Sequence, residues 1–201
     1  MKLTSLPLSF QHVSSVFLVA LIAISAFIIE QTTVGNSFTS FFVYQRSSIS
    51  QGEIWRLFTG HFLHTNSYHL LLNLAALIML WLLHGRFYSQ ANYTLLFLFS
   101  ALTTSLGIYY FSPDLQQYVG LSGVLHGVFI FGAILDIRAN DKTGYLLLLG
   151  VWLKIAHEQV YGASTEVSHL INANIAIDAH LWGALGGLLF SISYLFTDSK
   201  D

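Results

Sequence analysis

Apolar residues occur along this chain in long stretches, separated for the most part by short polar connections. A helix crosses the ~30 Å hydrocarbon core of a membrane with about 20 apolar residues, and six stretches reach or approach that length. They occupy residues 13–29, 68–83, 93–110, 121–137, 145–158 and 179–196. Several contain polar residues, which a multi-helix bundle tolerates where those residues face its interior. The pattern predicts an all-α, polytopic membrane protein, a bundle of six helices.

Lys and Arg residues in the connections predict the orientation of this bundle. With the N-terminus in the cytoplasm, the outer loops hold Arg46 and Arg56. The cytoplasmic side then holds Lys2, Arg86, Arg138, Lys142 and Lys200. Five cations against two predict that both termini lie in the cytoplasm (N-in, C-in). The two long connections, residues 31–67 and 161–177, then face outward.

The first stretch is also compatible with a cleaved signal peptide, because Ala23-Ile24-Ser25 loosely resembles a cleavage site. Its apolar run is longer than a typical signal core, and only Lys2 precedes it among the basic residues. A retained helix is the favoured interpretation.

Composition narrows the class of protein further. Of the 201 residues, 54% are hydrophobic and 9% are charged, whereas soluble domains carry roughly 25% charged residues. The length fits one domain, which we place over residues 1–201 with a core at 52–197. A net charge of −2 with scattered charges offers no surface for nucleic acid. The absence of cysteine excludes disulfides and a cysteine nucleophile.

In this topology the second, fourth and sixth helices all begin at the outer side. Polar residues near their N-terminal ends therefore share one depth in the membrane. These residues are His69, Asn73, Ser122 and His180. We expect them to converge just below the outer surface.

Ser122 lies in Gly120-Leu121-Ser122-Gly123, at the start of the fourth predicted helix. Serine is a weak nucleophile unless a base removes its proton. A histidine, whose unperturbed pKa is ~6.5, is the usual partner, and His180 lies at the matching depth. The pair predicts a nucleophile and its base.

Small residues predict how these two helices approach each other closely. Gly123 and Gly127 form a small-residue stripe on the fourth helix. The sixth carries another at spacings of four, formed by Ala179, Gly183, Gly187 and Ser191. Such stripes let transmembrane helices pack tightly, and alone they indicate packing more often than catalysis. A Ser and a His that lie at the outer ends of two such stripes indicate a catalytic pair more specifically than the stripes alone.

His69 and Asn73 are four residues apart and project from one helix face. An acyl-transfer site needs donors for the developing oxyanion, and these side chains offer a ring N–H and an amide NH₂. The alternative is a structural role, in which His69 caps the interface and Asn73 bonds a neighbouring helix.

These residues carry a family resemblance. His69-Leu70-Leu71-Leu72-Asn73, the segment at 120–123 and the segment at 179–187 resemble the rhomboid signatures HxxxN, GxSG and AHxxGxxxG, in the family's order. Trp55-Arg56 resembles the family's WR pair, and the segment at 61–64 resembles the approach to its second helix. The resemblance covers residues 52–187. A lone GxSG motif is unspecific, but all of these in register are specific.

The resemblance implies an intramembrane serine protease with a Ser122–His180 dyad, an acyl-enzyme, and neither cofactor nor metal. His69, Asn73 and the backbone N–H of Ser122 would bind the oxyanion. Gly120, Gly123 and Gly183 would support the site. Asp178 lies two residues from His180 and hence on another helix face, so it is not included.

The serine motif continues to His126 and Gly127, and this run resembles the rhombosortase branch of the family. That branch implies a bacterial inner-membrane enzyme with its active site toward the periplasm. Its partners would be single-span substrates with a C-terminal sorting tail that contains a Gly-Gly motif. The acyl group would pass to water or to a lipid amine, two acceptors that remain open.

Three polar residues in the spans have open roles. His126 lies one turn below Ser122, either bonded across helices or shaping the floor of the active site. Lys154 and Glu158 are four residues apart and are expected to pair, because a lone buried charge is costly in a membrane. A substrate-tail contact is a second possibility for Lys154.

Three rival functions remain to be weighed. A zinc protease needs His-Glu-x-x-His, and the position four residues after His157 is Tyr161, so that motif fails. His61 and His64 alone do not supply a full metal-ligand set. A rhomboid-like membrane chaperone without catalysis should lack the nucleophile or the base, and both are present. A transporter is not supported, because the chain lacks similar halves.

Overall fold

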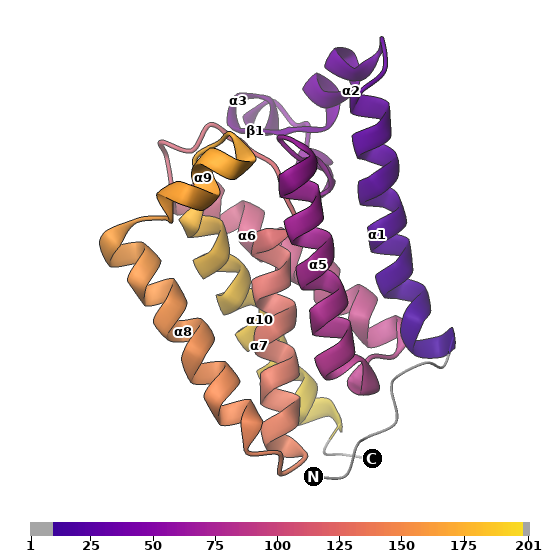
Figure 1. Ribbon diagram of the computed structural model, residues 1–201, viewed down its shortest axis with the longest axis vertical. Helices are drawn as coiled ribbons and strands as arrows, with labels where there is room; N and C mark the ends of the chain where they lie inside the picture. The colour runs from indigo at the N-terminus through magenta and orange to yellow at the C-terminus, as the bar shows by residue number, and fades with distance from the viewer. Residues whose placement is uncertain (1–9, 199–201) are drawn as a thin grey trace.

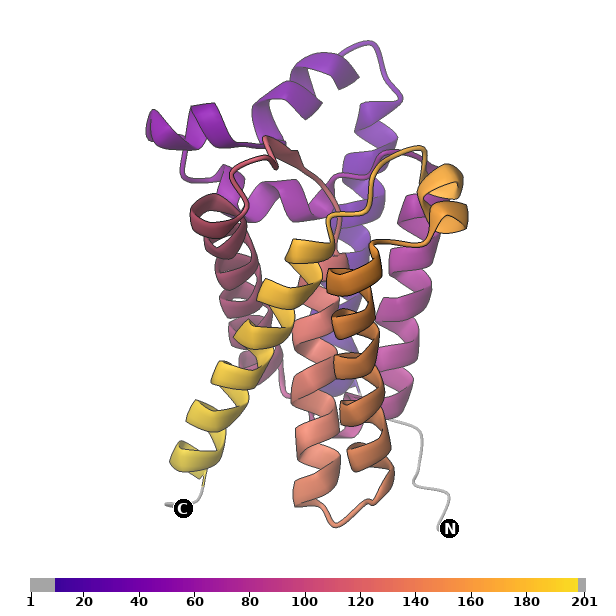
Figure 2. The same ribbon diagram turned by 90° about the vertical axis from the view of Figure 1, so that its left-hand side faces the viewer.

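The computed structural model describes residues 10–198, and its main feature is a set of six long helices that run along one axis (Figures 1 and 2). They are α1 (Phe10–Glu30), α5 (Ser67–His84), α6 (Gln90–Phe111), α7 (Ser122–Arg138), α8 (Thr143–Tyr161) and α10 (Ile177–Asp198). Five of the predicted apolar stretches each lie within one of these helices, and the remaining one, 121–137, begins one residue before α7. Lys2 and Lys200, used to predict the orientation, lie outside the described residues.

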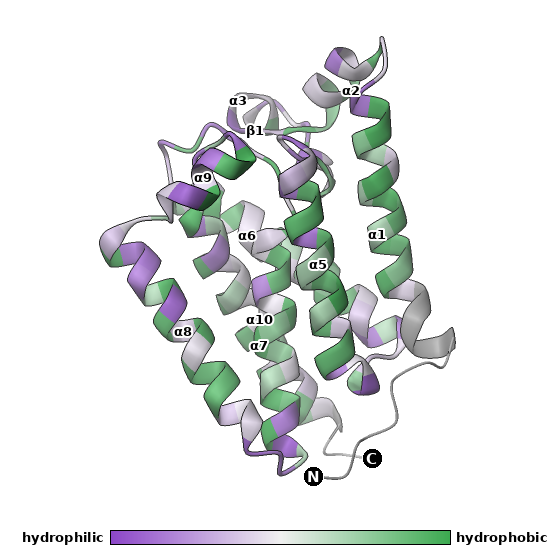
Figure 3. Cartoon of the chain, in the orientation of Figure 1, coloured by the Kyte–Doolittle hydropathy of each residue, from purple (hydrophilic) through white to green (hydrophobic). Residues whose placement is uncertain are grey.

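Three segments of this part of the chain are long and apolar enough to cross a membrane: Ser67–Phe87, Gln90–Phe111 and Ile177–Thr197. The first joins α5 to the short helix η2 (Gly85–Phe87). Figure 3 shows hydrophobic residues along the lengths of the long helices and hydrophilic ones in the connections and in the upper part of α8. The number of spans and their direction stay predictions.

Polar residues just before the apolar runs start several helices. The Asn66 side chain accepts a hydrogen bond from the His69 backbone at 2.9 Å, which caps α5. Ser89 and Asn92 form a capping box at α6. Such caps satisfy backbone N–H groups that have no partner within the helix. α5 and α6 therefore begin at Ser67 and Gln90, before the predicted stretches that start at residues 68 and 93.

The connection between α1 and α5 folds into short elements at one end of the bundle (Figure 1). They are α2 (Gly35–Phe42), β1 (Tyr44–Gln45), α3 (Arg46–Ser50), α4 (Arg56–Thr59) and η1 (Gly60–Phe62). The helix α9 (Thr165–Ile171), in the second long connection, lies at the same end. β1 pairs with β2 (Gln117–Tyr118), which precedes α7.

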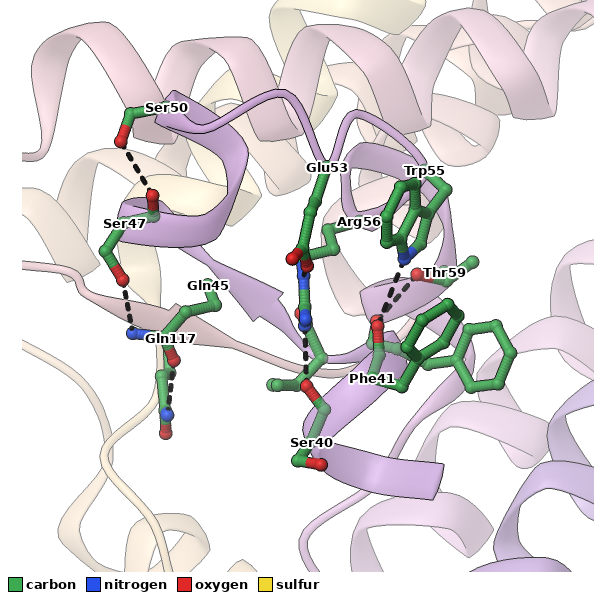
Figure 4. A network of polar contacts seen from close by, with 12 residues as sticks. Ser40, Phe41, Gln45, Ser47, Ser50, Glu53, Trp55, Arg56, Thr59 and Gln117 are labelled. Carbon is green, nitrogen blue, oxygen red and sulfur yellow. Dashed lines mark hydrogen bonds and ion pairs between the residues drawn. The ribbon is translucent and has the colours of Figure 1, made fainter. Parts of the chain in front are cut away.

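Trp55 and Arg56 hold this connection together (Figure 4). Arg56 is buried and donates to the Glu53 carboxylate at 2.6 Å and to the carbonyl oxygens of Ser40 and Val43 at 2.8 and 2.7 Å. The Trp55 ring stacks on Phe41, with centroids 5.2 Å apart, and its N–H donates to the Phe41 carbonyl. The motif that resembled the family's WR pair therefore fixes the loop end of the bundle.

Glycines set the distance between α7 and α10. A Cβ on Gly183 would overlap the Gly123 carbonyl oxygen, and one on Gly187 would overlap that of Gly127. No side chain fits between the two backbones at these levels. The two small-residue stripes predicted from the sequence thus face each other across the contact.

Candidate active site

Ser122 is placed by a glycine turn that leads into α7. Gly120 has φ +116°, a conformation that L side chains rarely adopt. Its N–H donates to the Gly60 carbonyl at 3.2 Å, and its own carbonyl accepts from the Tyr118 hydroxyl at 2.6 Å. Ser122 is the first residue of the helix, so its backbone N–H has no partner within α7.

His180 lies on the first turn of α10, opposite Ser122. Its Nε2 atom is 3.1 Å from Ser122 Oγ, and the ring is buried. The close approach of the two helices at Gly123 and Gly183 makes this distance possible. The structure therefore brings together the two side chains that the sequence paired.

His69 and Asn73 lie on α5 and face the segment before Ser122. A Cβ on Gly120 would lie 2.7 Å from His69 Nε2 and 3.8 Å from Asn73 Nδ2. The Thr65 backbone N–H donates to His69 Nδ1 at 3.4 Å, and in that tautomer His69 Nε2 is a donor toward the site. Asn73 uses one N–H on the His69 carbonyl at 3.1 Å and retains a second.

Glu158 also reaches the site, a contact that sequence reasoning missed. Its Oε2 atom is 2.8 Å from His180 Nδ1 and 2.9 Å from Lys154 Nζ. The predicted pairing of Lys154 with Glu158 is thus present, and it includes the histidine. The predicted topology could have indicated this contact, because it places the end of the fifth helix and the start of the sixth at the same outer side. Asp178, two residues from His180, does not supply this bond.

His126 connects α7 to α8. Its Nδ1 atom is 2.7 Å from the Ser122 carbonyl oxygen, and its Nε2 is 2.9 Å from Lys154 Nζ. Its ring stacks on that of His180, with centroids 4.2 Å apart. His126 therefore bonds across helices and at the same time lies against the candidate base.

His61 and His64, considered above as metal ligands, have other partners. His61 Nε2 is 3.0 Å from Ser105 Oγ, and burial lowers the pKa of this histidine to about 4. His64 Nδ1 is 3.2 Å from the Phe62 carbonyl oxygen, and burial lowers its pKa to about 3. Residues 10–198 contain no group of three or more potential His, Cys, Asp or Glu metal ligands.

Two cavities meet at Ser122. A cavity of about 490 Å³ at the loop end is lined by polar and apolar side chains, and the polar ones include Thr65, His69 and Asn174. A second, of about 430 Å³, lies among α5, α7 and α8 and has mostly apolar walls such as Met79 and Leu83. Asn73, His126 and Lys154 also line it. Ser122 therefore borders one cavity of mixed polarity and one that is almost entirely apolar.

The sequence of this chain matches the Rhomboid domain model over residues 51–196. The chain belongs to the rhomboid family. It is 28% identical to the rhomboid protease GluP of Bacillus subtilis (strain 168) over 156 residues, which are 78% of this chain and 29% of GluP. It is also 28% identical over 155 residues to YdcA of the same strain, a candidate rhomboid protease, with 76% and 72% covered.

The chain thus spans less than a third of GluP and most of YdcA. The family and the apolar helices indicate that this rhomboid chain is an integral membrane protein. The family match and the names of both relatives support its assignment to the intramembrane serine proteases. The range matched by the family model, residues 51–196, includes the positions of Ser122, Glu158 and His180.

Proposed function

We propose that this rhomboid domain cleaves a peptide bond of a transmembrane substrate near the outer face of the membrane, with Ser122 as nucleophile and His180 as base. The observation that carries the proposal is the 3.1 Å approach of His180 Nε2 to Ser122 Oγ. That distance is within the reach a general base needs. The rhomboid family match over residues 51–196 supports the same chemistry.

The reaction would follow the acyl-enzyme route. Ser122 Oγ attacks the carbonyl carbon while its proton moves to His180 Nε2. The resulting oxyanion would accept hydrogen bonds from the Ser122 backbone N–H, His69 and Asn73. On collapse, His180 returns the proton to the leaving amine. Water then attacks the acyl-enzyme, again with His180 as base, and frees Ser122 with a new carboxylate.

The two cavities suggest separate routes for substrate and water. The apolar cavity among α5, α7 and α8 would receive a substrate helix from the bilayer. The cavity at the loop end, which has the more polar lining of the two, would admit the water that completes the reaction. In the proposed bundle of six spans, with both termini in the cytoplasm, this end faces outward. Gly120, Gly123 and Gly183 support the site through the turn and the helix contact.

Within the family, we propose the rhombosortase branch and a C-terminal sorting tail with a Gly-Gly motif as substrate. The support is the run from Gly120 through His126 to Gly127. The enzyme would then reside in a bacterial inner membrane with its active site toward the periplasm. Transfer to a lipid amine instead of water would make the reaction a transpeptidation.

The proposal is tested with purified protein in lipid vesicles and a fluorophosphonate probe. The wild type should label and Ser122→Ala should not. Co-expression with a Gly-Gly-tailed substrate, followed by mass analysis of the new C-terminus, identifies the cleavage position and the acceptor. If Ser122 does not label and Ser122→Ala keeps its cellular function, the chain is a catalytically silent membrane chaperone. If the enzyme cleaves other transmembrane segments but not the Gly-Gly-tailed substrate, the sorting-tail proposal is excluded.

A further inference from the structure

We propose that Glu158 is a positioning residue that fixes His180 as a base, so that the site works as a Ser122–His180–Glu158 triad. The inference rests on the proposed protease function and deepens it. The family resemblance implies a dyad without an acid. The carboxylate comes from α8, 22 residues before the histidine, and is 2.8 Å from His180 Nδ1.

Donor and acceptor chemistry fixes the tautomer of His180. An ionised carboxylate only accepts hydrogen bonds, so His180 Nδ1 carries the proton and donates it to Glu158 Oε2. The Nε2 lone pair then faces Ser122 Oγ at 3.1 Å and accepts the hydroxyl proton. This is the tautomer that a general base requires. Glu158 would also stabilise the imidazolium that forms when the proton arrives.

Lys154 keeps the carboxylate ionised. Its ammonium group is 2.9 Å from Glu158 Oε2 and 2.9 Å from His126 Nε2. Ammonium groups only donate, so His126 accepts at Nε2 and donates from Nδ1 to the Ser122 carbonyl at 2.7 Å. One arrangement of protons therefore satisfies all four side chains. The Lys154–Glu158 pair is neutral overall, which lowers its cost inside a membrane.

A competing arrangement makes the proposal testable. Lys154 Nζ is also 3.1 Å from His180 Nδ1. If Lys154 donated to Nδ1, the histidine proton would lie on Nε2 and His180 could not accept from Ser122. The Glu158 carboxylate would then face a bare nitrogen at 2.8 Å, with no proton between the two acceptors. The shorter distance and the paired charges favour Glu158 as the partner.

The experiment measures kcat and KM for cleavage of a transmembrane substrate in vesicles. Glu158→Gln should lower kcat by about 10²–10⁴-fold, the range expected when the tautomer is no longer fixed, with little change in KM. Glu158→Asp should restore part of the loss. Lys154→Met removes the cation that keeps Glu158 ionised but retains the carboxyl group beside His180, so it should cost less than Glu158→Gln. Asp178→Asn is the matched control, an acid on α10 that does not bond His180, and should behave as wild type.

Wild-type kcat in Glu158→Gln would overturn the proposal, as would an equal loss in Asp178→Asn. If Glu158→Gln does not fold, the double variant Lys154→Met/Glu158→Met removes both charges together. This double variant should fold, and its kcat should show the loss predicted above for Glu158→Gln. Full activity of the double variant would exclude the triad.

A second measurement does not depend on cleavage. Nitrogen NMR of histidine-labelled protein, with His180→Gln to assign the signal among nine histidines, should show His180 protonated at Nδ1. In Glu158→Gln the proton should redistribute toward Nε2. Protonation of the wild type at Nε2 would exclude the positioning role. If the wild type neither cleaves nor labels, the protease function fails, and the tautomer still decides the role of Glu158.

Discussion

α7 carries a polar cluster at each end, and the two clusters differ in what surrounds them. At the loop end, the active-site cluster joins Ser122 and His126 to His180 and the pair on α8. At the other end, the basal cluster joins Asp136 to Arg86 at 2.6 Å and to the fully buried His84 at 3.1 Å. Both contain charges that a membrane interior disfavours unless they are paired.

The difference lies in access. Ser122 lines two cavities, and a chain of hydrogen bonds leads from it to a carboxylate. In the basal cluster the Asp136 carboxylate is the centre, and its partners are His84, the last residue of α5, and Arg86 in the segment that follows. Buried charge alone therefore does not mark a catalytic site. The loop-end cluster differs in that its serine faces two cavities, and four substitutions test whether this access distinguishes a catalytic site.

The largest effect is expected for His180→Ala. Loss of the base leaves Ser122 without a proton acceptor, and the cleavage rate should fall by about 10⁴–10⁶-fold, as for other serine nucleophiles that lose their histidine. The measurement is cleavage of a transmembrane substrate in vesicles, with thermal unfolding as a control for folding. Equal rates in the variant and the wild type would exclude His180 as the base.

Asp136→Asn should affect stability and spare the chemistry. It leaves His84 without its carboxylate and Arg86 with only the more distant Asp141 carboxylate, at 3.4 Å. Breaking a buried ion pair costs about 3 kcal/mol or more. Arg86 is 29% exposed, so the lower end of that range is expected. Denaturation in detergent should show the loss, while kcat of the folded fraction stays at the wild-type level. If Asp136→Asn lowers kcat and leaves stability unchanged, the basal cluster contributes to catalysis and the contrast between the two clusters is wrong.

Asn73→Ala removes an amide N–H that faces the segment before Ser122. Loss of one oxyanion donor costs about 10²–10³-fold in kcat, with KM near its wild-type value. Asn66→Ala is a useful control, because it removes a cap from the same helix and no donor from the site. A loss of equal size in both variants would assign Asn73 to helix structure.

Gly150→Leu should give the smallest effect. Gly150 lines the apolar cavity on α8, and a Cβ there would have no neighbour within 4 Å. A larger side chain would occupy the proposed substrate space, and we expect KM to rise by about 10-fold, which corresponds to ~1.4 kcal/mol of binding. Labelling of Ser122 by a small probe should not change. Reduced labelling would mean that the substitution disturbs the serine itself.

Much of the bundle and the approach of Ser122 to His180 could be predicted from the sequence. Apolar runs located the long helices, which extend beyond the runs because residues such as Asn66 and Ser89 cap them. The motifs around Ser122 and His180 predicted a candidate nucleophile and base, because the spacing within each motif is local.

Other features depend on contacts between distant segments. The bond from Glu158 to His180 requires the last turns of α8 to pack beside the first turn of α10, which no local pattern encodes. The short elements around β1 have no periodicity, and their form depends on buried bonds such as those of Arg56.

The glycine contacts between α7 and α10 restrict how this protein can diversify. At Gly183 and Gly187 even a methyl group would collide with backbone oxygen atoms, so a library randomised there should return glycine. At Gly150 on α8, by contrast, a Cβ would meet nothing within 4 Å. Variants that change substrate preference are therefore to be sought on α5 and α8. The glycine contacts keep the distance between α7 and α10 fixed.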